Sequence, residues 1–244
     1  MPSVTFDIVG TCFSYDNGAK GIEERLGPKL AKYGLSSKVV MYAVVCGTER
    51  DYSYLSQIGQ YKQFHTIFFG IFRRVLFQLG VPAKVLEGDF VTQEDLDHIY
   101  KEYFKLTARP GLKEMFQILR DGGFEVWALS DASFERVRGY FDGATVDIDD
   151  EHIISADSIG KGKPEAAVYQ LARDRVGADK PGEVAVFAAS HAWDCAAAKA
   201  IGFDVAYTTT YEWDECVEIF GKFDLVAPDL ISLGKGIVEK WGKK

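Results

Sequence analysis

The chain has 244 residues, a formal charge of -8 and hydrophobic side chains at 47% of its positions. This length and composition suit one α/β domain, alone or with a large insertion, and exclude a disordered or fibrous chain. The acidic balance offers no basic surface for a phosphate backbone. We therefore expect a small-molecule ligand and no nucleic-acid partner.

The sequence shows neither a cysteine pattern typical of a metal site or disulfide framework nor a recognisable targeting signal. The four cysteines lie far apart and form no CxxC pair, which argues against a zinc site or a disulfide framework. No signal-peptide pattern precedes the first apolar run, and no uncharged apolar run reaches the ~18 residues of a membrane span. We expect a soluble, cytoplasmic protein that does not contact a membrane.

The first predicted element is a strand over Val4–Val9, a β-branched and aromatic run that ends at a glycine. From Lys20 to about Phe104, apolar residues recur every three or four positions, which predicts helices. A Pro-Gly pair at 110–111 then ends this helical region.

Helices and strands alternate after that break. The predicted helices are 112–119, 165–173, 192–200 and 230–241, and the predicted strands are 124–129, 184–189, 205–208 and 224–226. Strands separated by helices predict a parallel sheet with helices on both faces. We therefore predict an α/β fold, with a Rossmann-like core of residues 1–14 and 107–244 and a helical cap insertion of residues 15–106.

Polar residues follow several predicted strands. In an open parallel sheet, ligands bind beyond the carboxyl ends of the strands, so these residues should gather there. The four polar segments are 7–11, 130–133, 163–164 and 190–194. The second and fourth are followed by helices, whose free N–H groups can hold an anion.

In order and spacing, these segments resemble the four motifs of the haloacid dehalogenase superfamily. They read Phe-Asp-x-x-Gly-Thr at 6–11, Leu-Ser-Asp-Ala-Ser at 129–133, Lys-Pro-Glu-Ala-Ala-Val-Tyr at 163–169 and Ser-His-Ala-Trp-Asp at 190–194. Details of the third and fourth are similar to the type II L-2-haloacid dehalogenases. The resemblance covers nearly the whole chain, and the inserted helices fall where that group carries its cap.

The resemblance implies a hydrolase that works through a covalent aspartyl ester. Asp7 would attack a substrate carbon, Lys163 would keep Asp7 ionised, and water would then open the ester at the Asp7 carbonyl. The implied catalytic residues are Asp7, Lys163, Asp194 and His191. The implied substrate-binding residues are Thr11, Ser130, Asp131, Ser190, Arg50 and Tyr169.

Two positions depart from the pattern of the superfamily. Its phosphatases place a second Asp two residues after the nucleophile, where this chain has Val9. Phosphatase chemistry would need Mg2+ at Asp7 and Asp194, and otherwise we expect no metal and no cofactor.

The cap Arg of the dehalogenases aligns with Cys46, although Arg50 lies one helical turn later. A Glu-Arg-Asp run is equally typical of a solvated face, so both interpretations of Arg50 stay open.

The fourth motif has His191 where the dehalogenases have Asn. Histidine can accept a proton near neutral pH, and we expect it to activate water with Asp194 as its orienting acid. His followed by Asp three residues later also resembles the cis-epoxysuccinate hydrolases of the superfamily. The predicted function is hydrolysis of a small carboxylate, like that of a 2-haloacid dehalogenase.

Alternatives to this function remain open. The first is epoxide hydrolysis, and the second is a Mg2+-dependent phosphatase. The third is a non-catalytic or biosynthetic relative that retains the fold. The expected partner is a small-molecule carboxylate, and a homodimer is left open. The aromatic run that contains Phe68 and Phe72 is expected to form the core of the cap.

Overall fold

The computed structural model describes residues 1–178 and 183–242. The chain divides into two compact units, one formed by residues 1–14 and 108–244 and the other by residues 15–107. We call them the sheet unit and the helical unit. The predicted division differs from this one only at Thr107, which belongs to the helical unit.

The sheet unit contains a six-stranded sheet in the order β5-β4-β1-β6-β7-β8. Its strands are β1 (Ser3–Asp7), β4 (Glu125–Ser130), β5 (Ile153–Ser155), β6 (Ala185–Ala189), β7 (Asp204–Thr208) and β8 (Leu225–Ala227). All five neighbouring pairs are parallel. The predicted parallel α/β fold is therefore confirmed, with β1 between β4 and β6.

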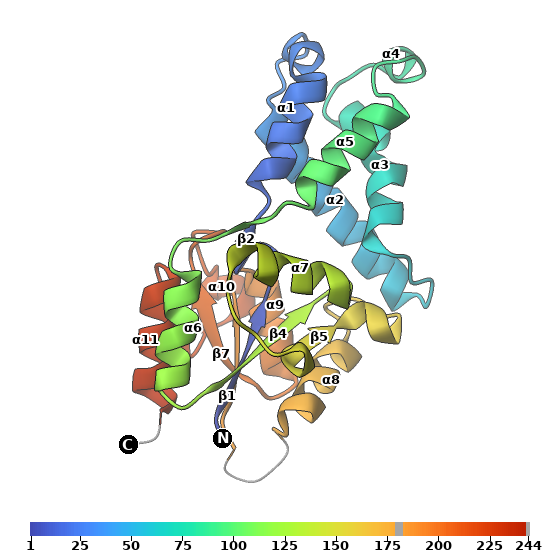
Figure 1. Ribbon diagram of the computed structural model, residues 1–244. Helices are drawn as coiled ribbons and strands as arrows, with labels where there is room; N and C mark the ends of the chain where they lie inside the picture. The colour runs from blue at the N-terminus through green and yellow to red at the C-terminus, as the bar shows by residue number, and fades with distance from the viewer. Residues whose placement is uncertain (179–182, 243–244) are drawn as a thin grey trace. The chain divides into compact units, whose positions relative to one another are not determined.

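Helices cover both faces of this sheet (Figure 1). They are α6 (Leu112–Asp121), α7 (Phe134–Ala144), α8 (Ala166–Val176), α9 (Ala192–Ala200), α10 (Val217–Phe220) and α11 (Leu230–Trp241). On one face, Leu129 and Phe187 share a buried cluster with side chains of α8 and α9. On the other, the Phe6 ring lies 5.5 Å from Phe116 of α6, which lies 5.8 Å from Phe141 of α7.

The first strand ends earlier than predicted. It stops at Asp7 because the next residues form a tight loop, in which the N–H groups of Cys12 and Phe13 both bond to the Ile8 carbonyl. Gly10 has a φ of 93° in this loop, a conformation that favours glycine. Asp7 is therefore the last residue of β1, at the carboxyl edge of the sheet.

Several elements of the sheet unit were not predicted from the sequence. They include β5, which has three residues, α7, which follows β4, and the four-residue α10. A three-residue strand is too short to show a hydrophobic period. A separate two-stranded sheet joins β2 (Phe13–Ser14) to β3 (Thr107–Ala108), where the chain passes between the units.

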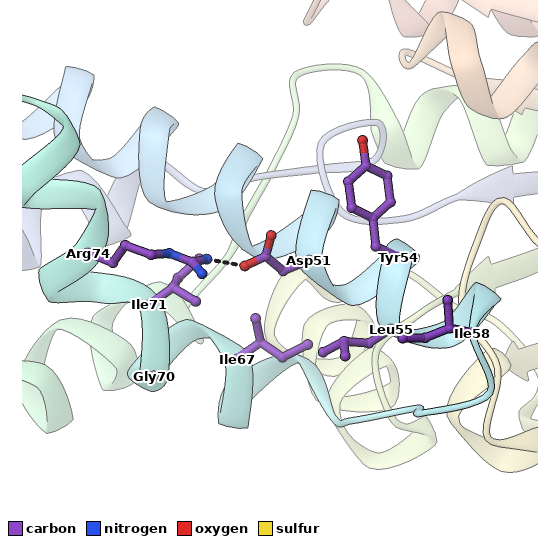
Figure 2. A pocket seen from close by; sticks show the side chains of 8 residues that line it. All are labelled: Asp51, Tyr54, Leu55, Ile58, Ile67, Gly70, Ile71 and Arg74. Atoms are coloured by element: carbon purple, nitrogen blue, oxygen red, sulfur yellow. Dashed lines mark hydrogen bonds and ion pairs between the residues drawn. The ribbon is translucent and has the colours of Figure 1, made fainter.

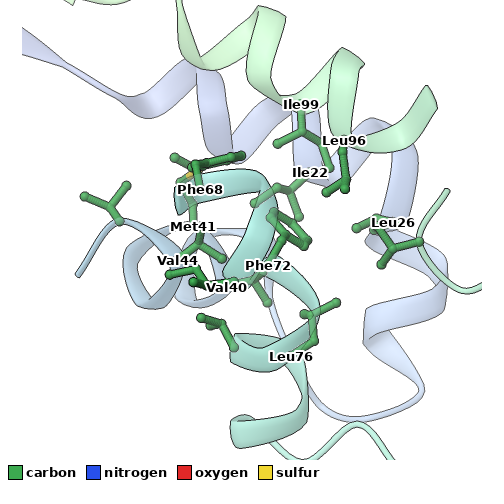
Figure 3. Close-up of a cluster of buried hydrophobic side chains, with 14 of the residues drawn as sticks. Ile22, Leu26, Val40, Met41, Val44, Phe68, Phe72, Leu76, Leu96 and Ile99 are labelled. Carbon is green, nitrogen blue, oxygen red and sulfur yellow. The ribbon is translucent and has the colours of Figure 1, made fainter. Parts of the chain in front are cut away.

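The helical unit packs around an apolar core (Figure 3). Its helices are α1 (Asp16–Ala31), α2 (Ser37–Gln57), α3 (Phe64–Gln78), α4 (Ala83–Leu86) and α5 (Gln93–Tyr103). Phe68 and Phe72 are fully buried in that core, which confirms the interpretation of the aromatic run. Gly21 lets α1 approach α5 closely, because a Cβ there would lie 2.9 Å from the Cβ of Glu102.

Across residues 1–178 and 183–242, no helix combines the length and the apolar character that crossing a bilayer requires.

Candidate active site

The predicted site residues gather where three neighbouring strands end. Asp7 ends β1, Ser130 ends β4, and Ser190 directly follows β6. Because these strands are parallel, their carboxyl ends meet at one edge of the sheet. Lys163 reaches the same edge from the segment that precedes α8.

The Lys163 ammonium bridges two carboxylates. Its Nζ donates to Oδ1 of Asp7 at 2.8 Å and to Oδ2 of Asp194 at 2.7 Å. The Tyr169 hydroxyl donates to the other Asp194 oxygen at 2.5 Å. The Lys163 side chain is only 2% exposed, so these bonds offset the large cost of removing its charge from water. Removing any one member would leave a buried polar group without its partner.

The second oxygen of Asp7 faces two further polar groups. Thr11 Oγ1 donates to Oδ2 at 2.6 Å, and His191 Nδ1 lies 3.2 Å from the same oxygen. Thr11 has one hydroxyl proton, so the Ser190 hydroxyl must donate in the 3.0 Å contact between them. A carboxylate has about four acceptor positions. Lys163, Thr11 and His191 occupy three of those of Asp7, which leaves one for a substrate.

The charge states of the site follow from these contacts. Burial alone raises the pKa of Asp7, but the Lys163 ammonium and His191 outweigh it, so the pKa lies well below its usual range. Burial lowers the pKa of Lys163, and the carboxylates of Asp194 and Asp7 more than reverse this. An ionised Asp7 accepts hydrogen bonds only, so we assign the proton of the His191–Asp7 contact to Nδ1.

Ser130 and Asp131 act on the backbone around the site. Ser130 Oγ accepts from the N–H of Ala132 at 3.1 Å, and Asp131 Oδ1 accepts from the N–H of Lys163 at 3.0 Å. Asp131 therefore holds the segment that carries the bridging lysine. Burial raises the pKa of Asp131 to about 7, although Lys163 opposes this shift.

The structure thus brings seven predicted site residues into one network. They are Asp7, Thr11, Lys163, Tyr169, Ser190, His191 and Asp194. Their catalytic and substrate-binding roles stay predictions. Arg50 lies on α2 of the helical unit, where its Nε donates to Asp51 at 2.9 Å, and its role as a substrate ligand also stays a prediction.

The expected orientation of His191 by Asp194 is wrong. His191 precedes α9 in an extended conformation and turns its Nδ1 toward Asp7. Asp194 lies in the first turn of α9, and its side chain binds Lys163 and Tyr169. The three-residue spacing placed both residues at the site but did not predict which partners their side chains would choose.

Two residues beside the site were not predicted from the sequence. The Tyr211 ring lies 5.0 Å from the His191 ring, and the Arg109 Cζ lies 5.8 Å from the Tyr211 ring. Tyr211 follows the end of β7 by three residues, so the rule that strand ends gather could have found it. Arg109 follows the short β3, which carries no such signal.

The metal required by the phosphatase alternative does not suit these residues. Mg2+ would have to bind Asp7 and Asp194, but Lys163 Nζ lies between these carboxylates and donates to both. Within the described ranges, no group of three or more His, Cys, Asp or Glu side chains is arranged to hold a metal ion.

A separate cavity of about 480 Å³ lies within the helical unit, between α2 and α3 (Figure 2). Its lining residues are Asp51, Tyr54, Leu55, Ile58, Ile67, Gly70, Ile71 and Arg74. Arg74 points toward Asp51 and forms an ion pair with it, while most of the remaining wall is apolar. Neither Cys46 nor Arg50 lines this cavity.

Comparison with known proteins identifies the family. The chain matches the haloacid dehalogenase-like hydrolases over residues 1–202. This match covers most of the sequence, including all four motifs. The protein therefore belongs to the haloacid dehalogenase-like hydrolases.

Individual relatives carry related names. The chain is 31% identical to haloacetate dehalogenase H-2 of Moraxella sp. (strain B) over 111 residues, covering 46% of this chain and 49% of the relative. It is 32% identical to (S)-2-haloacid dehalogenase 4A of Burkholderia cepacia over 108 residues, covering 44% of this chain and 46% of the relative. In both cases the chain spans about half the length of the relative it matches.

Solved structures share the fold. The L-2-haloacid dehalogenase of Xanthobacter autotrophicus, solved with chloropropionic acid covalently bound, aligns with a TM-score of 0.75 and 18% identity. The alignment covers 99% of this chain and 100% of that one. The fold of both units therefore has precedent among dehalogenases.

Proposed function

We propose that this protein hydrolyses a small carboxylate at a carbon atom through an ester on Asp7, as a 2-haloacid dehalogenase does. The observation that carries this proposal is the ionised Asp7 carboxylate, held by Lys163, Thr11 and His191 with one acceptor position left. The names of the relatives and the covalent adduct described for the Xanthobacter enzyme support it.

In the first half-reaction, an Asp7 oxygen attacks the substrate carbon from the side opposite the leaving group. The new C–O bond forms as the C–halogen bond breaks, and the halide departs with the bonding electron pair. Lys163 keeps Asp7 ionised and therefore nucleophilic at neutral pH. The product of this step is an ester of Asp7.

In the second half-reaction, water attacks the Asp7 carbonyl carbon. When Oδ1 carries the ester, the oxygen that gains negative charge is Oδ2, which lies next to the donors Thr11 and His191, and these stabilise it as in an oxyanion hole. Asp194, held by Tyr169 and Lys163, orients the water and takes its proton. The ester bond to Asp7 then breaks, Asp194 returns the proton to the departing oxygen, and the hydroxy acid leaves.

Epoxide hydrolysis is the second candidate, and one contact favours it. An epoxide that opens on Asp7 leaves an alkoxide on the neighbouring carbon, and this alkoxide needs a proton. His191 lies 3.2 Å from Asp7 and carries a proton on the nitrogen that faces it. A departing halide needs no proton, so the histidine is better explained by the epoxide reaction.

One screen with three readouts tests these proposals. The purified protein is incubated with 2-haloacids, epoxy acids and phosphate esters, each with and without a chelator. Halide release supports the first proposal, diol formation supports the second, and chelator-sensitive phosphate release would contradict both. Single turnover in 18O water, with enzyme in excess, should then give product whose new oxygen comes from Asp7 and is unlabelled.

A further inference from the structure

We propose that Arg109, supplied by the sheet unit, binds a carboxylate group of the substrate. This inference rests on the proposed function, because it assumes an anionic substrate that reacts at Asp7. It assigns to the sheet unit a task that the resemblance assigns to an arginine of the helical insertion.

The charge balance of the site requires such a group. The Lys163 ammonium donates to both Asp7 and Asp194, so two carboxylates already share this one cation. A substrate carboxylate that approached this site would meet more negative than positive charge. Binding it therefore calls for another cation close to Asp7.

Arg109 is anchored to the loop that follows Asp7. Its Nε donates to the Gly10 carbonyl at 2.8 Å, and its backbone N–H donates to the Cys12 carbonyl at 2.9 Å. The residue between them, Thr11, donates to the Asp7 carboxylate. The half-buried Arg109 side chain is thus held beside the same loop that positions the nucleophile.

A second contact, with the ring of Tyr211, also holds the guanidinium. Its Cζ lies 5.8 Å from the centre of the Tyr211 ring, and that ring lies 5.0 Å from the ring of His191. The next residue, Glu212, accepts a hydrogen bond from the N–H of Ala192 at 2.7 Å, which ties this segment to the start of α9. Arg109 is therefore fixed in direction before a ligand arrives, and preorganisation of this kind favours binding.

The terminal nitrogens of Arg109 are the part left for a ligand. Within residues 1–178 and 183–242, its guanidinium bonds to protein only through Nε. In every other arginine of these ranges, at least one terminal nitrogen bonds to a protein oxygen; these are Arg25, Arg50, Arg73, Arg74, Arg120, Arg136, Arg138, Arg173 and Arg175. Two parallel N–H groups match the two oxygens of a carboxylate.

The competing arginine of the helical unit is already engaged. Arg50 directs both its Nε and a terminal nitrogen to one oxygen of Asp51, at 2.9 Å each. Binding a substrate carboxylate there would first require this pair to separate. Arg109 has no such competitor among the described residues.

Binding to an inactive protein tests the assignment without turnover. The Asp7→Asn variant is titrated calorimetrically with 2-chloropropionate, with cis-epoxysuccinate, and with the neutral analogue 2-chloropropionamide. The same titrations are repeated after adding Arg109→Gln, and after adding Arg50→Gln, which tests the competing arginine. Arg109→Gln should weaken binding of the acids about 10- to 100-fold and leave amide binding unchanged, because only the charged hydrogen bonds are lost. Arg50→Gln should change acid binding less than about twofold.

Four results would overturn the assignment. Unchanged acid affinity without Arg109 would reject it and leave the proposed function standing, as would a greater loss from Arg50→Gln. Equal losses for acid and amide would show that Arg109 only shapes the loop. If neither acid binds to the Asp7→Asn protein, the proposed function fails together with this inference. Should Arg109→Gln not fold, Arg109→Lys can replace it. Lysine keeps the positive charge but lacks the two parallel N–H groups, so this variant should weaken binding of the acids alone.

Discussion

The two units bury different kinds of side chain. The sheet unit encloses charged and polar groups beside its apolar core, with Asp194 and Lys163 at 0% and 2% exposure. In the helical unit, the core cluster is formed by aliphatic and aromatic side chains. Its buried acid, Asp95, pairs with a partly exposed Arg25 at 2.8 Å.

Because of this difference, we expect the stability of the two units to depend on pH in different ways. Buried charges cost stability unless each is paired, so a network such as Asp7–Lys163–Asp194 makes stability depend on pH. An apolar core contributes stability that does not depend on protonation. We therefore expect substitutions in the sheet unit to change activity and pH dependence, and substitutions in the helical core to change stability at every pH.

The largest effect is expected for Asp7→Asn. Removing the nucleophile should lower kcat by a factor on the order of 10^4 to 10^6, while the similar shape of the side chain preserves the fold. Turnover of the best substrate from the screen measures the first quantity, and circular dichroism checks the second. Substantial residual turnover would remove Asp7 from the covalent route.

Lys163→Met tests the charged network directly. It leaves two buried carboxylates without their cation, so stability at pH 7 should fall by about 3–5 kcal/mol. As the pH falls, the carboxylates of the folded variant take up protons and the penalty shrinks. Urea unfolding at pH 5 and pH 7 measures this difference, and an equal loss at both would argue against charge as the cause.

Phe72→Ala is the matched test in the helical unit. Phe72 is fully buried, and its loss should cost about 3–5 kcal/mol through lost burial and a residual cavity. The same urea experiment should give one value at pH 5 and pH 7. A strong pH dependence would contradict the separation drawn between the two units.

His191 substitutions sharpen the comparison within the site. His191→Leu removes the donor to Asp7 and should slow ester hydrolysis about 100- to 1,000-fold, whereas His191→Asn keeps an N–H donor and should stay within about tenfold of the wild type. Mass spectrometry of protein quenched during turnover should show the ester accumulating in the leucine variant. Equal accumulation in both variants would instead favour a base.

The smallest effect is expected for Asp131→Asn. The pKa of Asp131 is raised to about 7 in the folded protein, above its value of about 3.9 in an unfolded chain. Between these values the folded state binds more protons, so this residue lowers the free energy of unfolding as the pH rises. Between pH 5 and pH 7, the free energy of unfolding of the asparagine variant should therefore rise by about 2 kcal/mol relative to that of the wild type. If the difference in free energy of unfolding between the variant and the wild type is the same at both pH values, Asp131 is already ionised at pH 5.

The residues at the strand ends could be predicted from the sequence because two local signals coincide, the ends of apolar runs and the order of the four motifs. An apolar run ends at Asp7, another ends at Ser130, and a third precedes Ser190; the four motifs lie in the expected order. The period of the apolar residues likewise predicted the inserted helices and the burial of Phe72. Such signals need only neighbours in the chain.

Side-chain partners could not be predicted in the same way. The sequence by itself determined a parallel α/β sheet with a helical insertion and the set of polar residues at its carboxyl edge. Only the tertiary structure decided that His191 faces Asp7, and that Arg109 and Tyr211 lie together although about 100 positions separate them. Hydrogen-bond geometry, ring packing and desolvation select such partners, and these act between atoms that meet only when the chain has folded.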